Sequence, residues 1–397
     1  MGLFRKQSGA PRGPTRVQSG MGILKGKRPV VGLDIEPGFI AAAEFTNGQG
    51  LTLTKAATGV LQPGLFHDGE VVDVDGLAEQ LKSFFADQKL SRRVRLGVAN
   101  QRVVVRVLEL PSIESEDELD AAVRFQAQEE LPMPLDQAVL DHRVLERFSR
   151  DGGAYVRVLA VAVRRETVEQ LLEATRKAGL APEIVDLSAF AIVRALYASM
   201  PSHEAMGMHQ DPSAGAQPAG GDPATIPGTV YCYVGGLTNL AIATGSTCLF
   251  NRVLPNGFEA MASTLAERRG LTLDHSRQWL RHVGLEREVA QIEGESEIVA
   301  EAREVMLQAT RRIADEIRLS LEYYEGSVPD AHRVERMVVA GPAIAIPGFP
   351  AALAAELGLA VESRSLGHVN VEPGVLDAVD PSQLTVAAGL ALDEVLG

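Results

Sequence analysis

The sequence has few of the residues that cross-link a chain or carry it through a membrane. Only two of its 397 residues are cysteine, so no disulfide framework is indicated. It contains no apolar run near the roughly 20 residues that a transmembrane helix needs. A basic excess is also missing: the formal net charge is −14, which argues against a general nucleic-acid binder because phosphates would be repelled. We therefore expect a cytoplasmic protein, long enough for two or more domains.

The motifs of common enzyme sites are missing too. The sequence has no P-loop, GxGxxG, HExxH, GxSxG or CxxC motif. Its eight histidines are scattered, and none has metal-ligand spacing to another ligand. No residue is therefore predicted to be catalytic, and enzymatic activity is not expected.

Two segments differ from the rest in composition. Residues 1–28 contain seven Lys or Arg, no acidic residue, and many Gly, Pro and Ser. They are either a weak tether to anionic lipid, a disordered tail, or a stretch that precedes a true start at Met21. Residues 201–228 hold five Pro and five Gly and no Lys or Arg, which is typical of a flexible linker between two halves.

Each half begins with the same order of elements. The first has apolar runs at 30–35, 39–45 and up to Val60, separated by turns at 36–38 and at Asn47-Gly48, and then a helix with Leu77, Leu81, Phe84 and Phe85 on one face. The second has runs at 230–234, 238–244 and 247–254, with turns at Gly235-Gly236 and Gly245-Ser246, and then a helix containing Phe258, Met261 and Leu265. This repetition predicts two similar lobes.

An inserted unit separates the first lobe from the linker. Strands are expected at 93–99, 103–110, 139–145 and 155–163. Ser115 and Glu118 form a capping box that opens a helix to about residue 130, where Pro132 and Pro134 end it. Further helices are expected around 168–175, 190–197, 301–324 and 384–396, with a strand at 337–340 that ends in Gly341-Pro342.

Four segments resemble the PilM family of type IV pilus assembly proteins. They are LDIEPGFIAAAEF (33–45), LELPSIESEDELDAAVRFQAQEELPMPLDQAVLDHRVLE (108–146), IADEIRLSLEYYE (313–325) and PSQLTVAAGLAL (381–392). The resemblance implies an α/β, actin-like (ribonuclease H-like) fold of duplicated lobes with an inserted α+β subdomain, called 1C. It divides the chain into a basic tail (1–28), subdomain 1A (29–92 and 180–200), 1C (93–179), a linker (201–228), 2A (229–256 and 331–397) and 2B (257–330).

The same resemblance implies a function and partners. A PilM-like protein is a cytoplasmic scaffold, peripheral to the inner membrane, that binds the N-terminal cytoplasmic tail of a PilN-like membrane protein and so connects pilus platform and motor proteins. The family's peptide groove lies between 1A and 1C. Its expected contributors here are Leu108, Leu110, Phe125 and Leu131, although each of them can instead pack the core of 1C.

The resemblance also implies a nucleotide site for ATP and Mg²⁺ between the lobes. The matching positions are Asp34 (which would hold Mg²⁺ through water), Gly38, Gly235, Gly236, Thr238, Asn239 and Gly341. Tyr233 replaces a second aspartate, Glu36 replaces a glycine, Ala41 replaces a common lysine, and Pro342 replaces another glycine. A carboxylate 4 Å from a phosphate costs about 4 kcal/mol at an effective dielectric near 20. We therefore expect hydrolysis to be lost and ATP binding weakened or lost, in which case Asp34 caps the turn.

The alternative is an actin-like ATPase or polymerising protein of the FtsA type. Such a protein would end in an amphipathic membrane helix, whereas residues 384–397 are apolar and rich in Ala, without a basic face. A small-molecule kinase of the same superfamily would need a catalytic aspartate beside the second turn, and the sequence shows none there.

Overall fold

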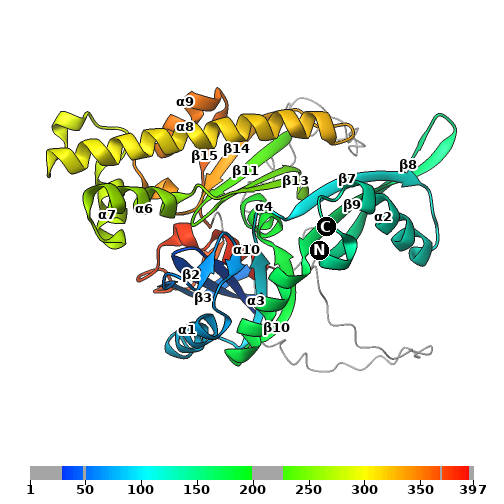
Figure 1. Cartoon of the computed structure of the whole chain (residues 1–397), viewed down its shortest axis with the longest axis horizontal. Helices are drawn as coiled ribbons and strands as arrows, with labels where there is room; N and C mark the ends of the chain where they lie inside the picture. The colour runs from blue at the N-terminus through cyan, green and yellow to red at the C-terminus, as the bar shows by residue number, and fades with distance from the viewer. Residues whose placement is uncertain (1–28, 48–50, 199–226, 367–368, 393–397) are drawn as a thin grey trace, which may run out of the picture.

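The computed structural model describes residues 29–47, 51–198, 227–366 and 369–392, which form two lobes and a smaller sheet that projects from one side (Figure 1). The predicted basic tail, nearly all of the predicted linker and the Asn47-Gly48 turn from residue 48 lie outside the described residues. Among the helices that are described, none is both long enough and apolar enough to cross a bilayer.

The first lobe is built on a six-stranded sheet in the order β10-β6-β1-β2-β3-β16. Its strands are β1 (Val31–Glu36), β2 (Phe39–Asn47), β3 (Leu51–Val60), β6 (Arg93–Val98), β10 (Ala181–Leu187) and β16 (Asn370–Val371), with a small hairpin of β4 (Phe66–His67) and β5 (Glu70–Val71) beside it. Its helices are α1 (Val74–Asp87), α3 (Arg165–Lys177), α4 (Ser188–Ala198) and α10 (Thr385–Ala391). The β1–β2–β3 meander is antiparallel, whereas β6 and β10 run parallel to β1 and need crossovers to reach it.

Small residues on β1 and β2 allow α10 to pack closely against the sheet of the first lobe. Ala41 and Ala43 on β2 are fully buried and share a face of the sheet with Gly32 on β1, which lies directly against the backbone of α10. A larger side chain at any of these positions would hold the helix away from the sheet. The end of the chain therefore returns to the first lobe, where α10 packs against β1, β2 and α4.

The second lobe repeats the plan with a five-stranded sheet in the order β13-β12-β11-β14-β15. Its strands are β11 (Gly228–Val234), β12 (Thr238–Thr244), β13 (Thr247–Leu254), β14 (Val334–Ala340) and β15 (Ala360–Ser363). Its helices are α6 (Phe258–Arg269), α7 (Leu273–Val283), α8 (Ser296–Ser327) and α9 (Phe349–Leu357). The long α8 runs along the outer side of the lobe (Figure 1), and its buried stripe includes Ile313, Ile317 and Tyr324. The predicted helix 301–324 lies inside α8.

The projecting sheet has the order β7-β9-β8 and carries one helix. Its elements are β7 (Val104–Pro111), α2 (Glu116–Glu130), β8 (Ala138–Arg150) and β9 (Gly153–Arg164). The Ser115 side chain accepts a hydrogen bond from the backbone N–H of Glu118 at 3.4 Å, which confirms the predicted N-cap of α2. Asp151 and Gly152 both have positive φ, as the tight turn of the β8–β9 hairpin requires.

The strand pairing confirms the actin-like fold class, and the division into subdomains stays a proposal. Within this division, the contacts between elements change two of the expected subdomain boundaries. β6 lies between β1 and β10, and α3 packs against α1, so we place subdomain 1C at residues 104–164 rather than 93–179. β16 pairs with β3 and α10 packs on β1, so the end of the chain goes with 1A rather than 2A.

Candidate functional site

The turns that follow β1 and β11 meet between the two lobes. Pro37 and Gly38 connect β1 to β2, and Gly38 has a φ of +91°, which a type II turn requires after proline. Gly235, Gly236 and Leu237 connect β11 to β12. A Cβ atom on Gly236 would lie 2.4 Å from the carbonyl oxygen of Pro37, so the two turns touch through their backbones.

Glu36 joins the two turns through its side chain. Its Oε2 accepts a hydrogen bond from the backbone N–H of Leu237 at 2.9 Å, and the carboxylate also accepts one from the N–H of Gly236. Glu36 is only 2% exposed. Burial raises the pKa of Glu36 to about 7, against the lowering effect of these two hydrogen bonds and with a further rise from nearby Glu259. The N–H groups of the second turn are thus bound to a carboxyl group supplied by the chain itself.

Asp34 and Tyr233 occupy matching positions on β1 and β11, and both are buried. Burial, and then the charge of Glu36, raise the pKa of Asp34 well above its usual value. Burial raises the pKa of Tyr233 as well, so its hydroxyl stays neutral. Asp34 Oδ2 and the Tyr233 hydroxyl have no hydrogen-bond partner in the described part of the chain. Mg²⁺ prefers charged oxygen ligands, and this pair offers one carboxylate that burial disfavours in its charged form.

The remaining predicted nucleotide residues serve the second lobe itself. The Thr238 hydroxyl donates a hydrogen bond to a backbone carbonyl of the same lobe. The Asn239 Oδ1 accepts one from Asn251 Nδ2 at 2.8 Å. Gly341 has a φ of +91°, and a Cβ atom there would lie 2.8 Å from the carbonyl oxygen of Val234. The structure therefore brings the first and second turns into contact and places Gly341 beside the end of β11, while Thr238 and Asn239 form bonds within the second lobe.

The residues between the lobes do not fit Mg²⁺-ATP. The amides that would face a phosphate already bind Glu36, and the turns that would flank it touch each other. No group of three His, Cys, Asp or Glu side chains that could hold a metal ion occurs among the residues that the structure describes. The arrangement holds the lobes together, and we derive no phosphoryl-transfer step from it.

Replacing Tyr233 by Phe is expected to leave the free energy of unfolding unchanged or to raise it by up to about 1 kcal/mol, because a buried hydroxyl without a partner contributes no stability. Urea unfolding of the wild type and Tyr233→Phe measures this. The matched control is Tyr324→Phe: the Tyr324 hydroxyl accepts a hydrogen bond from the N–H of His332 at 3.1 Å, and its loss should cost about 1 kcal/mol. A Tyr233→Phe protein less stable than Tyr324→Phe would show that the Tyr233 hydroxyl has a partner.

The projecting sheet holds the predicted partner-binding residues in two different settings. Leu108 and Leu110 are 2% and 5% exposed and pack with Val123 of α2 in the core of this unit. Phe125, on the same helix, is 68% exposed, and Leu131 at its C-terminal end is partly buried. Of the four predicted residues, Phe125 and Leu131 are therefore the two that present apolar surface to solvent.

Residues 32–208, which contain the first lobe's β1–β2 turn and the whole projecting sheet, match the family model for the type IV pilus assembly protein PilM. Over these residues the chain is similar to the PilM family. The fold similarity extends further: a solved structure of a PilM–PilN type IV pilus biogenesis complex matches with a TM-score of 0.71 and 24% identity, over 91% of this chain and 97% of that one.

Two other solved structures match this chain at lower similarity. The ethanolamine utilization protein EutJ from Carboxydothermus hydrogenoformans matches with a TM-score of 0.50 and 14% identity, over 92% of this chain and 90% of that one. MreB5 of Spiroplasma citri, bound to ADP, matches with a TM-score of 0.46 and 13% identity, over 91% and 94%.

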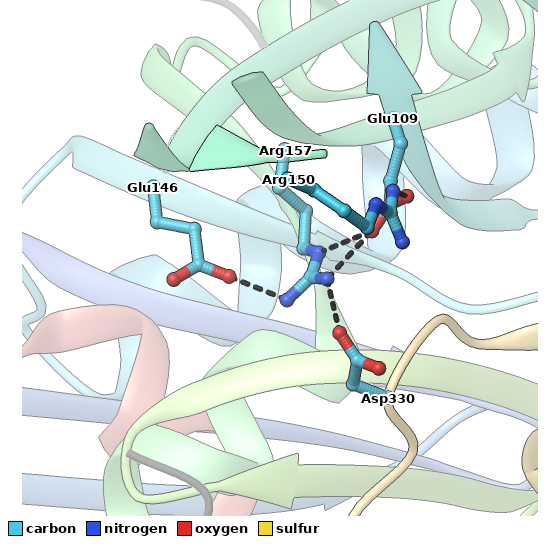
Figure 2. Close-up of polar contacts among 5 residues, drawn as sticks. All are labelled: Glu109, Glu146, Arg150, Arg157 and Asp330. Carbon is cyan, nitrogen blue, oxygen red and sulfur yellow. Dashed lines mark hydrogen bonds and ion pairs between the residues drawn. The ribbon is translucent and has the colours of Figure 1, made fainter. Parts of the chain in front are cut away.

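A cluster of charges connects the projecting sheet of this PilM-like chain to its second lobe (Figure 2). Arg157 on β9 bonds Glu109 through Nε at 3.2 Å and Nη2 at 2.6 Å, and it also bonds Glu146. Its Nη2 reaches Asp330 of the second lobe at 2.6 Å, and Arg150 bonds Glu109 from the side. Partial burial alone would raise the pKa of Glu109, but the hydrogen bonds from Arg157 and Arg150 outweigh it, and the pKa lies below its usual value.

A cavity of about 190 Å³ lies beside this cluster, between the projecting sheet and the second lobe, with Val107, Leu145, Leu249 and Val328 among its lining residues.

The charged cluster was not predicted from the sequence, because its members come from β7, β8, β9 and the loop after α8. Sequence reasoning also missed Glu259, which lies against Gly38 of the first turn, and Arg277, which bonds Glu259. Nothing in their sequence context marks them, since each is an ordinary polar residue on a helix.

Proposed function

We propose that this chain is a scaffold of the type IV pilus inner-membrane platform, which binds the N-terminal cytoplasmic tail of a PilN-like membrane protein. The observation that most strongly supports this proposal is the match to the PilM family model over residues 32–208. This segment includes the projecting sheet with its exposed Phe125. The similarity to PilM from a PilM–PilN complex supports the choice of partner. In this proposal the protein works in the cytoplasm at the inner membrane, beside other platform and motor proteins, and binds no nucleic acid.

The proposed scaffold works through its surface rather than by nucleotide turnover. The contact between the turns, with Glu36 bound to Leu237, supports a cleft that is closed to ATP. An FtsA-type ATPase would need these turns apart, so that their amides could face a phosphate. Calorimetric titration with Mg-ATP, with phosphate release followed in parallel, separates the two functions. Turnover would establish the ATPase.

Replacing Phe125 by Ser is expected to weaken binding of the PilN-like peptide at least tenfold, because exposed aromatic anchors supply much of the affinity of a peptide groove. The melting temperature should hardly change, since the side chain is 68% exposed. The measurement is calorimetric titration with the N-terminal peptide of the PilN-like protein from the same organism.

The matched control is Val72→Ser, which removes an equally exposed apolar side chain (63%) from a loop of the first lobe and should leave the affinity unchanged. Equal affinities of Phe125→Ser and wild type would remove Phe125 from the binding surface. No binding of the peptide to the wild type at millimolar concentration would contradict the proposed function itself.

A further inference from the structure

Glu36 is a buried carboxyl group whose hydrogen bonds cross from one lobe to the other. It ends β1, and its hydrogen bonds come from the Gly236 and Leu237 amides, about 200 residues further along the chain. Consecutive backbone N–H groups in a glycine turn form a concave site that binds anions. A buried carboxylate without such donors would be strongly destabilising, so the turn and the carboxylate satisfy each other.

Glycine residues around the Glu36–Leu237 contact allow the turns of the two lobes to lie close together. Gly236 lies against Pro37, and a Cβ atom on Gly257 would lie 2.4 Å from the carbonyl oxygen of Gly235. A Cβ atom on Gly38 would lie 2.6 Å from the carboxylate of Glu259. Gly236 and Gly38 thus permit an approach of the two lobes that a side chain at either position would obstruct, and Gly257 permits close packing of the turn within the second lobe.

Glu259 would repel Glu36 if it were left without a partner. Arg277 on α7 binds it through Nε, at 2.9 and 3.1 Å from its two oxygens, and through Nη2 at 2.7 Å. This bidentate pair neutralises the second carboxylate beside the turn. The carboxyl group that bonds the amides of this turn is therefore that of Glu36.

We propose that Glu36 is an internal anionic ligand that fastens the two lobes together at the Gly236–Leu237 turn, and that shortening its side chain exposes an oxyanion-binding site there. This inference rests on the closed cleft of the proposed function and specifies what closes it. The site would take a carboxylate-sized oxyanion, and a phosphate if the turns separate.

The test is rescue of Glu36→Ala by added anions. The substitution removes the carboxylate but keeps the backbone, so sodium formate should bind the vacated amides and raise the melting temperature by about 2 °C at saturation, relative to sodium chloride of equal ionic strength. Glu36→Gln keeps an oxygen acceptor on the same amides, so neither it nor the wild type should respond. Inorganic phosphate forms a second arm, compared with the wild type at the same concentration.

The outcomes separate clearly. Rescue by formate alone supports an internal ligand in a cleft that stays closed, and rescue by both anions supports a phosphate site behind Glu36. Rescue by neither, or an equal response of Glu36→Gln, overturns the proposal. The PilN-like peptide is titrated into the same proteins, so a failed rescue with intact peptide binding rejects the internal ligand and leaves the scaffold function standing.

A second variant covers the case in which Glu36→Ala does not fold. Glu36→Asp keeps the charge but is one methylene shorter, so it should not reach both amides. Hydrogen exchange of the Gly236 and Leu237 amides should then be at least tenfold faster than in the wild type, while Glu36→Gln retains their protection. Equal exchange rates in Glu36→Asp and wild type would contradict the proposal.

Discussion

Gly389→Ala is expected to lower the free energy of unfolding by about 3 kcal/mol, at the upper end of the cost of overpacking a core. Gly389 lies in α10 where it crosses α4, and a Cβ atom there would lie 1.9 Å from the carbonyl oxygen and 2.5 Å from the carbonyl carbon of Ala191. Both are backbone atoms of α4 at the fully buried Ala191, so relief requires the helices to separate. Urea unfolding of the two proteins measures the difference.

The matched control is Gly326→Ala in α8, where the added methyl meets no atom within 4 Å. Both substitutions replace a helical glycine by alanine, which favours a helix by up to about 1 kcal/mol. Gly326→Ala should therefore be neutral or stabilising, and the difference between the two variants isolates the α10–α4 crossing. If Gly389→Ala is as stable as Gly326→Ala, the two helices do not approach as closely as the structure places them.

The α10–α4 crossing also shows what sequence could and could not predict. The apolar, Ala-rich end of the chain predicted a buried helix, and the described part of it, α10, confirms this. The helix against which α10 packs could not be predicted from the sequence, because Ala191 lies about 200 residues earlier in the chain. The sequence placed the end of the chain with the second lobe, whereas contacts between residues distant in sequence return it to the first.

Local signals gave the most accurate predictions. The strands β12 and β13 begin and end where their turn glycines and apolar runs indicated, and α2 begins after its predicted cap at Ser115. β10 was missed because its sequence, APEIVDL, contains a proline and two acidic residues, and its position beside β6 is what makes it a strand. α7 was missed because only Ser276, Leu280 and Val283 of its eleven residues are buried.

At the site, too, local features were predicted from the sequence and contacts between distant residues were not. The resemblance implied that the turns containing Gly38, Gly235 and Gly236 face each other between the lobes, and the structure places Gly236 against Pro37 of the first turn. Glu36 was predicted to repel a phosphate, but its bond to Leu237 depends on the distance between two lobes and is invisible in the sequence. Leu108 and Leu110 were ambiguous from the start: both faces of β7 are covered, and these two side chains face α2 rather than solvent.

Arg157→Ala is expected to destabilise the protein by about 3 kcal/mol, because it leaves the carboxylates of Glu109, Glu146 and Asp330 close together without their shared cation. The side chain of Arg157 is 14% exposed, so water cannot replace it fully. Arg157→Lys should recover only part of the loss, since a lysine cannot bond Glu109 through two nitrogens as the guanidinium does. Urea unfolding of the three proteins measures both effects.

Asp330→Ala tests whether the charged cluster holds the projecting sheet against the second lobe. The Asp330 side chain is 75% exposed, so removing it should cost less than about 1 kcal/mol of global stability. It is nevertheless the member of the cluster that lies on the second lobe, so hydrogen exchange in β7–β9 should accelerate although the melting temperature hardly moves. Unchanged exchange in β7–β9 would mean that Arg157 acts only within the projecting sheet. Faster exchange would show that the Arg157–Asp330 bond holds the proposed partner-binding unit against the second lobe.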